Sequence, residues 1–141
     1  MSGPRVGSAV LITDGAQVVL GRRGKQPMFG KWVLPGGKIE EFESIDEAAE
    51  REANEETGLQ VKIERRLGVF EVINPPDEHR LIIYSEATPI GGELRAGSDL
   101  LEVRFFARHD LDRLDITPTV KAVLQMAGWV QPPIEGLSRA G

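Results

Sequence analysis

Three glutamates near the middle of the chain, Glu52, Glu55 and Glu56, have the types and the spacing that a metal site needs. On a helix, residues three and four apart lie on the same side, so these carboxylates would gather together. Clustered carboxylates repel one another and lose hydration, and a bound cation relieves both effects. Because the ligand atoms are all oxygens, a hard ion, Mg²⁺ or Mn²⁺, is expected there.

The segment around these glutamates is strongly acidic. From Gly36 to Leu59 it holds nine acidic and two basic residues, in a chain whose net charge is −5. A solvated acidic helix face is the ordinary interpretation of such a segment, and it accounts for Glu47 and Glu50. It does not account for Glu52 and Glu56, which share a helix face with small apolar residues.

Local signals predict a helix from about Ile45 to Thr57. Ser44 and Glu47 have the spacing of a capping box, and Gly58 is the expected left-handed residue after the last turn. Helical phasing directs four residues toward the protein: Ile45, Ala48, Ala49 and Ala53. It directs five others toward water: Asp46, Glu47, Glu50, Asn54 and Thr57.

The spacing of the segment resembles the Nudix box, GX5EX7REUXEEXGU, in which U is a bulky apolar residue. The match runs from Gly37 through Glu43 and Arg51 to Leu59, with the small residue Ala53 at the first U position as a soft departure. The resemblance implies an α/β/α sandwich, in which a mixed β-sheet carries the box helix and a C-terminal helix on its faces. It also implies hydrolysis of a pyrophosphate bond with the help of a divalent metal.

The helical phasing and the resemblance together assign roles in the box. The expected metal ligands are Glu52, Glu55 and Glu56, and the resemblance adds the backbone carbonyl of Gly37. Arg51 falls about 100° from Glu52 around the helix, away from the buried stripe. We therefore expect Arg51 to pair with Glu43 and to clamp the preceding loop onto the helix, a use that the resemblance also implies.

The sequence leaves the general base open. Glu52 or Glu55 is one choice. The resemblance suggests another, because members of the family recruit an extra carboxylate from a late loop, here Asp99 or Glu102. Asp99 follows Gly97 and fits a simple turn, so Glu102 is the candidate for a catalytic role.

Basic residues and glycines near the box are candidates for substrate binding. Arg22 and Arg23 lead toward the glycine pair Gly36 and Gly37, and Lys38 follows it. Glycines let a backbone approach a ligand closely, and cationic side chains bind phosphate. For any single one of these cations, solubility is an equally good explanation.

The substrate class is less clearly specified than the reaction. The GRR and PGGKIE segments resemble the MutT-like branch that cleaves oxidised nucleotides, which favours a nucleoside triphosphate giving a monophosphate and pyrophosphate. The later segments resemble small bacterial members that cleave ADP-ribose or nucleotide sugars, but an N-terminal extension typical of those is not expected before Val6. A non-catalytic nucleotide-sensing module is an alternative of another class, and the complete set of three glutamates argues against it.

Composition limits the remaining possibilities. A chain of 141 residues with 40% hydrophobic and 28% charged residues suits one globular domain, expected over residues 1–130 with a flexible tail over 131–141. The absence of cysteine excludes disulfides and a thiol nucleophile. No secretory signal or membrane span is evident, so a cytoplasmic monomer or homodimer is expected. The acidic balance argues against a stable nucleic-acid partner and leaves a nucleotide as the expected small-molecule partner.

Hydrophobic patterning predicts strands on both sides of the acidic helix and a second helix near the C-terminus. The expected strands are Val6–Thr13, Gln17–Gly21, Trp32–Leu34, Val61–Asn74 (irregular at Gly68), His79–Ala87 and Glu102–Arg108. The second helix is expected from Pro118 to about Ala127, with Thr117 as its N-cap. This order indicates an α/β fold.

Overall fold

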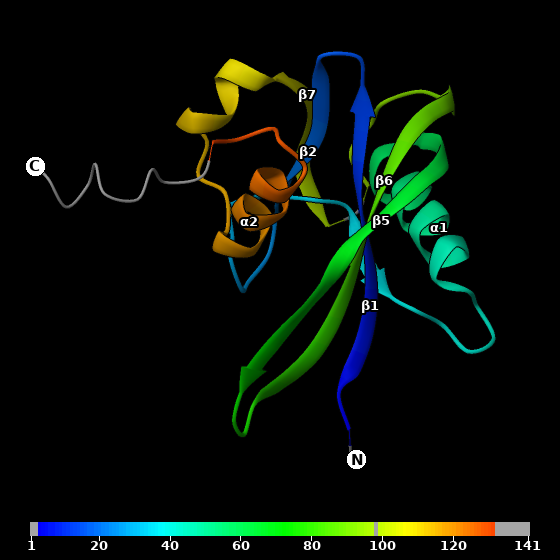
Figure 1. The fold of residues 1–141 in the computed structure, drawn as a ribbon, viewed down its shortest axis with the longest axis vertical. Coiled ribbons are helices and arrows are strands. Elements are labelled where there is room, and N and C mark those ends of the chain that lie inside the picture. The colour runs from blue at the N-terminus through cyan, green and yellow to red at the C-terminus, as the bar shows by residue number, and fades with distance from the viewer. Residues whose placement is uncertain (1–2, 98, 132–141) are drawn as a thin grey trace, which may run out of the picture.

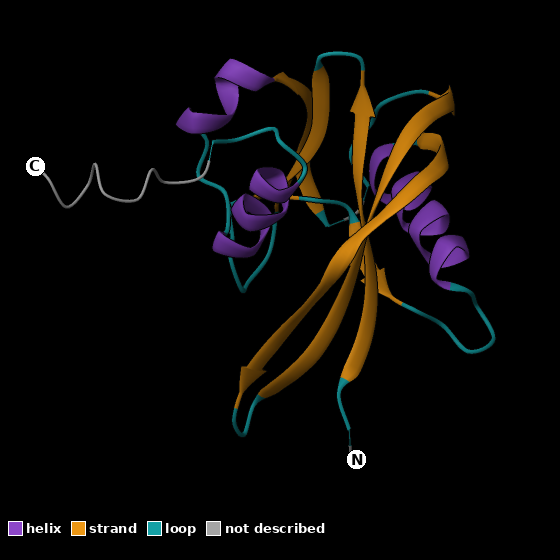
Figure 2. Ribbon diagram, viewed as in Figure 1, coloured by secondary structure: helices purple, strands orange, loops and turns teal. Residues whose placement is uncertain are grey.

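The computed structural model describes residues 3–97 and 99–131, and it shows a mixed sheet between two helices (Figures 1 and 2). The elements in chain order are β1 (Arg5–Asp14), β2 (Gln17–Arg23), β3 (Trp32–Val33), β4 (Gly36–Lys38), α1 (Ile45–Thr57), β5 (Leu59–Asn74), β6 (Glu78–Gly92), β7 (Leu100–Ala107), a 3₁₀ helix η1 (Arg108–Arg113) and α2 (Pro118–Met126). Neither α-helix in the described ranges has the length and hydrophobicity of a membrane span. The tail expected from residue 131 onward lies outside the described residues except for Gln131.

Strand β1 is the centre of the sheet. The strand order is β3-β2-β1-β6-β5, with β4 also paired to β1 and β7 paired to β2. The β1–β6 pair is parallel, whereas the other strand pairs are antiparallel. The predicted mixed α/β sandwich is therefore confirmed.

The two faces of the sheet form two apolar cores, because successive residues of a strand point to opposite faces. Leu11 on β1 packs in the core that α2 covers, and its neighbours Val10 and Ile12 pack in the core that α1 covers. These three residues are completely buried, as expected for a strand with helices on both faces. The sheet thus fixes the position of α1 relative to β1 and β4.

One local prediction was wrong, and one strand was not predicted. Gly36 and Gly37 belong to strand β4, which is absent from the expected strands, and they pair with Ala9 and Ser8 of β1. Thr57 was expected to face water, yet it is fully buried. Its hydroxyl donates to the carbonyl of Ala53 at 2.6 Å and accepts the amide of Leu59 at 3.2 Å, so its polar atom is satisfied inside the protein.

The other elements follow the prediction with shifted ends. Helix α1 has the expected bounds, and the register of β5 against β6 is irregular near Gly68, as expected. Strand β5 begins two residues earlier than predicted, β6 continues as far as Gly92, and β7 begins at Leu100. Strand β3 ends at Val33, and α2 ends at Met126.

Candidate active site

Helix α1 is fixed at both ends and along its buried face. The Ser44 hydroxyl accepts the amide of Glu47 at 3.0 Å, and the Glu47 carboxylate accepts the amide of Ser44 at 2.8 Å. Gly58 adopts the left-handed conformation with φ of 78° and closes the last turn. The Ser8 hydroxyl of β1 donates to the carbonyl of Ile45 at 3.0 Å. These contacts hold the glutamates of α1 at a defined place beside the sheet.

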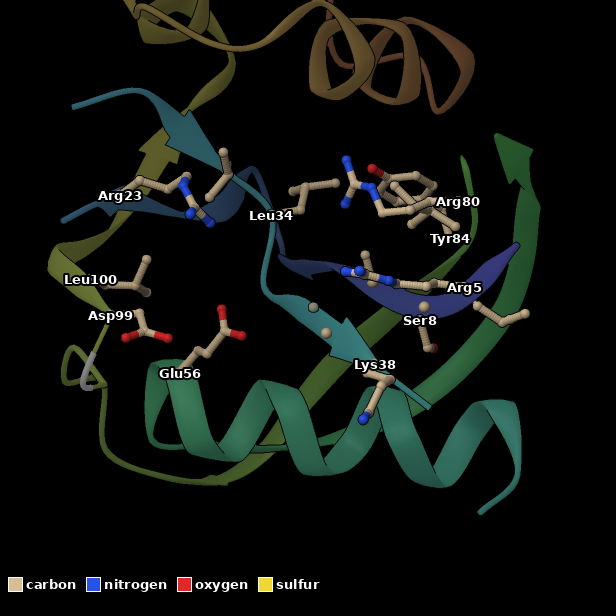
Figure 3. Close-up of a pocket in the computed structure, with 17 residues that line it drawn as sticks. Arg5, Ser8, Arg23, Leu34, Lys38, Glu56, Arg80, Tyr84, Asp99 and Leu100 are labelled. Atoms are coloured by element: carbon tan, nitrogen blue, oxygen red, sulfur yellow. The ribbon is translucent and has the colours of Figure 1, made fainter. Parts of the chain in front are cut away.

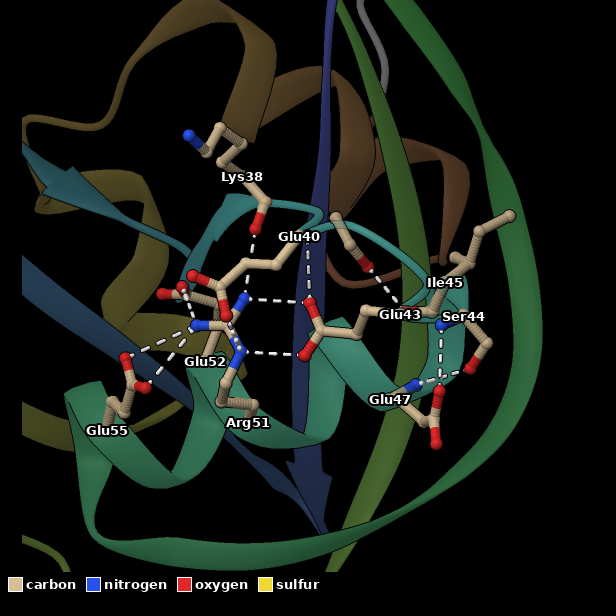
Figure 4. Close-up of polar contacts among 10 residues, drawn as sticks. Lys38, Glu40, Glu43, Ser44, Ile45, Glu47, Arg51, Glu52 and Glu55 are labelled. Atoms are coloured by element: carbon tan, nitrogen blue, oxygen red, sulfur yellow. Dashed lines mark hydrogen bonds and ion pairs between the residues drawn. The ribbon is translucent and has the colours of Figure 1, made fainter.

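Arg51 is the centre of a polar network on this helix (Figure 4). Its Nε and Nη2 donate to the two oxygens of Glu43 at 2.7 and 3.0 Å, and Nη2 also donates to the Lys38 carbonyl at 2.9 Å. This pairing lowers the pKa of Glu43 to about 2 and raises the pKa of Arg51 above its ordinary value. Arg51 was expected to point away from Glu52, but its Nη1 donates to Glu52 at 2.7 Å. The guanidinium therefore joins the loop to the glutamate cluster as well.

Glu52 and Glu56 face each other under the β4 strand. The Glu52 side chain is only 12% exposed, and a Cβ atom at Gly37 would lie 2.6 Å from its carboxyl group, so a larger residue at that position would displace the carboxylate. Burial, together with the hydrogen bond and the negative charge of Glu52, raises the pKa of Glu56 to about 9. The backbone amide of Gly36 acts in the opposite direction. A like-charged, partly buried pair of this kind is what a cation would stabilise.

The side chains fit a hard divalent cation, although the third glutamate lies apart. Glu55 is 57% exposed and turned toward Arg51 Nη1 at 3.4 Å. Within the described residues, no three acidic or histidine side chains converge into a complete ligand set. Glu52 and Glu56 offer adjacent oxygens, and Glu55 directly precedes Glu56 on the same helix. The donor set is all oxygen, as Mg²⁺ prefers.

Mg²⁺ should bind more tightly as the pH rises from 4.5 toward about 9, because Glu56 must lose its proton to act as a ligand. The raised pKa of Glu56 should also make the metal-free protein less stable as the pH rises from 4.5 to about 9. A carboxyl whose pKa is higher in the folded state stabilises that state only while it is protonated. Calorimetry at pH 7 in two buffers of different ionisation enthalpy should show release of about one proton per ion bound. An affinity that is independent of pH would contradict the placement of Glu56 in the metal site.

A pocket of about 380 Å³ opens beside this pair (Figure 3). Glu56 and Asp99 lie at one end of it, and Leu34 and Tyr84 form part of its wall. Four cationic side chains also line it: Arg5, Arg23, Lys38 and Arg80. The pocket therefore combines a metal-compatible acidic end with a cationic remainder, which suits a polyanionic ligand.

Only some of the predicted substrate contacts lie at the pocket. Arg23, Gly36, Gly37 and Lys38 line it. Arg22 does not, because its Nε donates to Glu102 on β7 at 3.0 Å. Arg22 and Arg23 are neighbours on β2, but the register of β2 against β7 shifts between them, and only Arg23 lines the pocket.

The late carboxylate nearest to the cluster is Asp99 rather than Glu102. Glu102 pairs with Arg22 and, at 3.1 Å, with Arg104, and it does not line the pocket. Asp99 lines the pocket, and its negative charge contributes to the raised pKa of Glu56. A hydrogen bond of 2.9 Å from the amide of Gly24 to its carbonyl and an ion pair of 3.0 Å with Lys25 hold Asp99 there. Both Asp99 and Glu102 were candidates from the sequence, but the contacts that place Asp99 at the pocket and Glu102 away from it could not be predicted from the sequence.

Arg5 and Arg80 are pocket residues that sequence reasoning missed. They come from β1 and β6, which lie side by side in parallel. The sequence pattern shows that Arg80 and Tyr84 share one face of their strand, because they are separated by an even number of residues. No local pattern shows that β1 is the neighbour of β6, or that this face lies at the pocket.

Comparison with known proteins identifies the family. The sequence model of the NUDIX domain matches residues 3–126. The chain belongs to the Nudix family. The segment from Gly37 to Leu59, whose spacing resembles the Nudix box, lies within the matched residues.

Relatives within the Nudix family act on different nucleotides. The chain is 38% identical over 112 residues to the ADP-ribose pyrophosphatase of Methanocaldococcus jannaschii, a match that covers 79% of this chain and 66% of the relative. It is 34% identical over 87 residues to the oxidized purine nucleoside triphosphate hydrolase of Mus musculus, covering 60% and 56%. The chain thus spans less than two thirds of either relative.

A solved structure shares the Nudix fold over nearly its whole length. The MutT NUDIX hydrolase from Burkholderia pseudomallei superposes with a TM-score of 0.81 at 29% identity, covering 89% of this chain and 98% of the other. The two-helix sandwich around a mixed sheet is therefore an arrangement that a Nudix hydrolase has in experiment.

Proposed function

We propose that this protein is a hydrolase that requires Mg²⁺ or Mn²⁺ and cleaves a pyrophosphate bond in a nucleoside diphosphate linked to another group. A nucleoside triphosphate, oxidised or not, is the first candidate, with a monophosphate and pyrophosphate as products. The observation that carries the proposal is the partly buried pair of Glu52 and Glu56, of which Glu56 lies at the acidic end of a pocket that is also lined by four cationic side chains.

The position of each residue determines its proposed role, either as a metal ligand or as a residue that positions a ligand. Glu52, Glu55 and Glu56 would hold the cation, with the Gly37 carbonyl as a further ligand. A divalent cation there supplies charge neutralisation for the phosphates and lowers the pKa of bound water. Arg51 holds Glu52 in place through its 2.7 Å hydrogen bond and is in turn held by Glu43.

A general base must lie within hydrogen-bond reach of the water molecule whose proton it takes. Glu52 and Glu55 remain candidates, and Asp99 replaces Glu102 as the candidate from the late loop because Asp99 lies at the pocket. The charged network around Glu102 instead joins β2 to β7.

The charge of the pocket favours a substrate with more than two negative charges. Four cationic side chains face two acidic ones along its walls, and a bound divalent cation would add to the positive side. A nucleoside triphosphate carries more negative charge than ADP-ribose, and so gains more from this lining. ADP-ribose remains the second candidate because the relative in Methanocaldococcus jannaschii is named as an ADP-ribose pyrophosphatase.

Incubation with Mg²⁺ and a substrate panel should distinguish these candidates. The panel contains the common and oxidised nucleoside triphosphates, ADP-ribose, nucleotide sugars and dinucleoside polyphosphates. We expect pyrophosphate and a nucleoside monophosphate from a triphosphate. Release of ribose 5-phosphate from ADP-ribose alone would favour the second candidate, and no turnover of any compound would favour a nucleotide-sensing module.

A further inference from the structure

Two arginines lie side by side at the end of the pocket away from Glu56. Arg5 of β1 and Arg80 of β6 are register partners in the parallel pair. Partners in neighbouring strands point to the same face of a sheet, and both side chains line the pocket (Figure 3). The strand pairing therefore brings two guanidinium groups, 75 positions apart in the sequence, to one place.

Within the described residues, the positive charges of Arg5 and Arg80 are only partly compensated by acidic side chains. Arg80 Nε lies 2.7 Å from the carboxylate of Glu78, with no hydrogen bond formed at that nitrogen. Arg5 has no ion pair with any residue in the ranges 3–97 and 99–131. Guanidinium groups donate hydrogen bonds and accept none, so this end of the pocket offers donors and positive charge. Its complement is a ligand group rich in anionic oxygens.

The wall between the two ends is mostly apolar or backbone. Leu34, Ile82 and Tyr84 line it on one side, and the strand from Gly36 to Lys38 lines it on the other. Because burial raises the pKa of Tyr84 to about 12, its hydroxyl stays protonated and is a further donor near Arg80. One continuous pocket thus has an end that suits a metal and its bound pyrophosphate, and another end that suits a separate anion.

We infer that Arg5 and Arg80 form a second phosphate subsite, which recognises a phosphate group beyond the pyrophosphate bond that is cleaved. This inference rests on the proposed function and narrows it to substrates with an additional phosphate. The additional phosphate has two possible sources: the γ-phosphate of a nucleoside triphosphate, or a phosphate on the sugar of the distal group.

Matched pairs of compounds test the subsite directly. The first pair is dGTP and dGDP, and the second is ADP-ribose 1″-phosphate and ADP-ribose, where the 1″-phosphate is on the distal ribose; within each pair the members differ by one phosphate. The ratio of kcat/KM within each pair is measured for the wild type, Arg5→Gln and Arg80→Gln. Arg65→Gln is the matched control, since Arg65 also lies on the β5–β6 hairpin, within 2.6 Å of a carboxylate, but does not line the pocket.

We expect the wild type and the control to prefer the phosphate-bearing member of at least one pair. Each pocket variant should reduce that preference about tenfold or more, chiefly through KM. The pair that responds identifies the source of the phosphate. Ratios that are the same in the wild type and both variants would overturn the subsite. If kcat/KM also falls equally for both members of each pair, the arginines contact a part of the substrate that both members share.

Failure of the proposed function is distinguishable from failure of the subsite. If no compound is cleaved, the proposed function fails. Calorimetry with Mg²⁺ present then gives the dissociation constant of each compound, and the ratio of dissociation constants within each pair replaces the ratio of kcat/KM. A preference that both variants lose still supports the subsite, and the absence of a preference overturns it. If the wild type cleaves both members of each pair equally well, the proposed function still holds, but the phosphate subsite at Arg5 and Arg80 is rejected.

Discussion

Replacing Glu56 with glutamine should lower kcat by about 10²- to 10⁴-fold while the protein remains folded. Glutamine has nearly the same shape as a protonated glutamate, and the raised pKa of about 9 means that Glu56 carries a proton at neutral pH when no metal is bound. The amide oxygen can still accept the hydrogen bond from Gly36. Glutamine supplies no negative charge to a cation, however, so the loss should fall on metal binding and turnover.

The stability of this variant separates a functional loss from misfolding. Its melting temperature without metal should equal that of the wild type near pH 6 and exceed it near pH 9, because the wild-type carboxyl is then forced to ionise in a partly buried site. Added Mg²⁺ should raise the melting temperature of the wild type far more than that of the variant. Glu50→Gln, on the exposed side of the same helix, is the control and should behave like the wild type. Near-normal turnover in Glu56→Gln would remove Glu56 from the metal site.

Features that depend on neighbours within one helix were predictable from the sequence. The capping box, the terminal glycine and the phasing of Glu52 and Glu56 are local relations, and each has a pattern of fixed spacing. The pairing of Arg51 with Glu43 spans only eight positions and was also expected. Its additional bond to Glu52 was not, because helical phasing gives the direction of the Cβ atom and a long side chain can turn back.

Features that depend on strand pairing were not predictable in the same way. Gly36 became a strand residue because its backbone pairs closely with β1, where a Cβ atom would lie 2.6 Å from that of Ala9. A pair of glycines is a pattern shared by turns and by such close approaches. The neighbours Arg5 and Arg80, and the choice of Asp99 over Glu102, likewise follow from register and loop contacts between distant segments.

Replacing Arg51 with alanine should lower both stability and activity, because one side chain holds the loop and the glutamate cluster together. The variant loses two hydrogen bonds to Glu43, one to Glu52 and one to the carbonyl of Lys38. Charge-assisted hydrogen bonds at a site that is 25% exposed should contribute about 2 kcal/mol in total to the free energy of unfolding, measured by urea denaturation. The rate should fall as well, because Glu52 loses the partner that orients it.

The dependence on pH distinguishes this clamp from a general loss of packing. The pKa of Glu43 is lowered from 4.5 to about 2, so the pairing stabilises the fold above pH 4.5 and is lost as the pH falls toward 2. The difference in unfolding free energy between the wild type and Arg51→Ala should therefore shrink over that range. Arg51→Lys keeps the charge but not the bidentate contact with Glu43, and its stability should lie between those of the wild type and Arg51→Ala. Arg66→Ala removes a more exposed pair with Asp46 and should cost less. If Arg51→Ala melts at the wild-type temperature at pH 7, Arg51 does not act as a clamp.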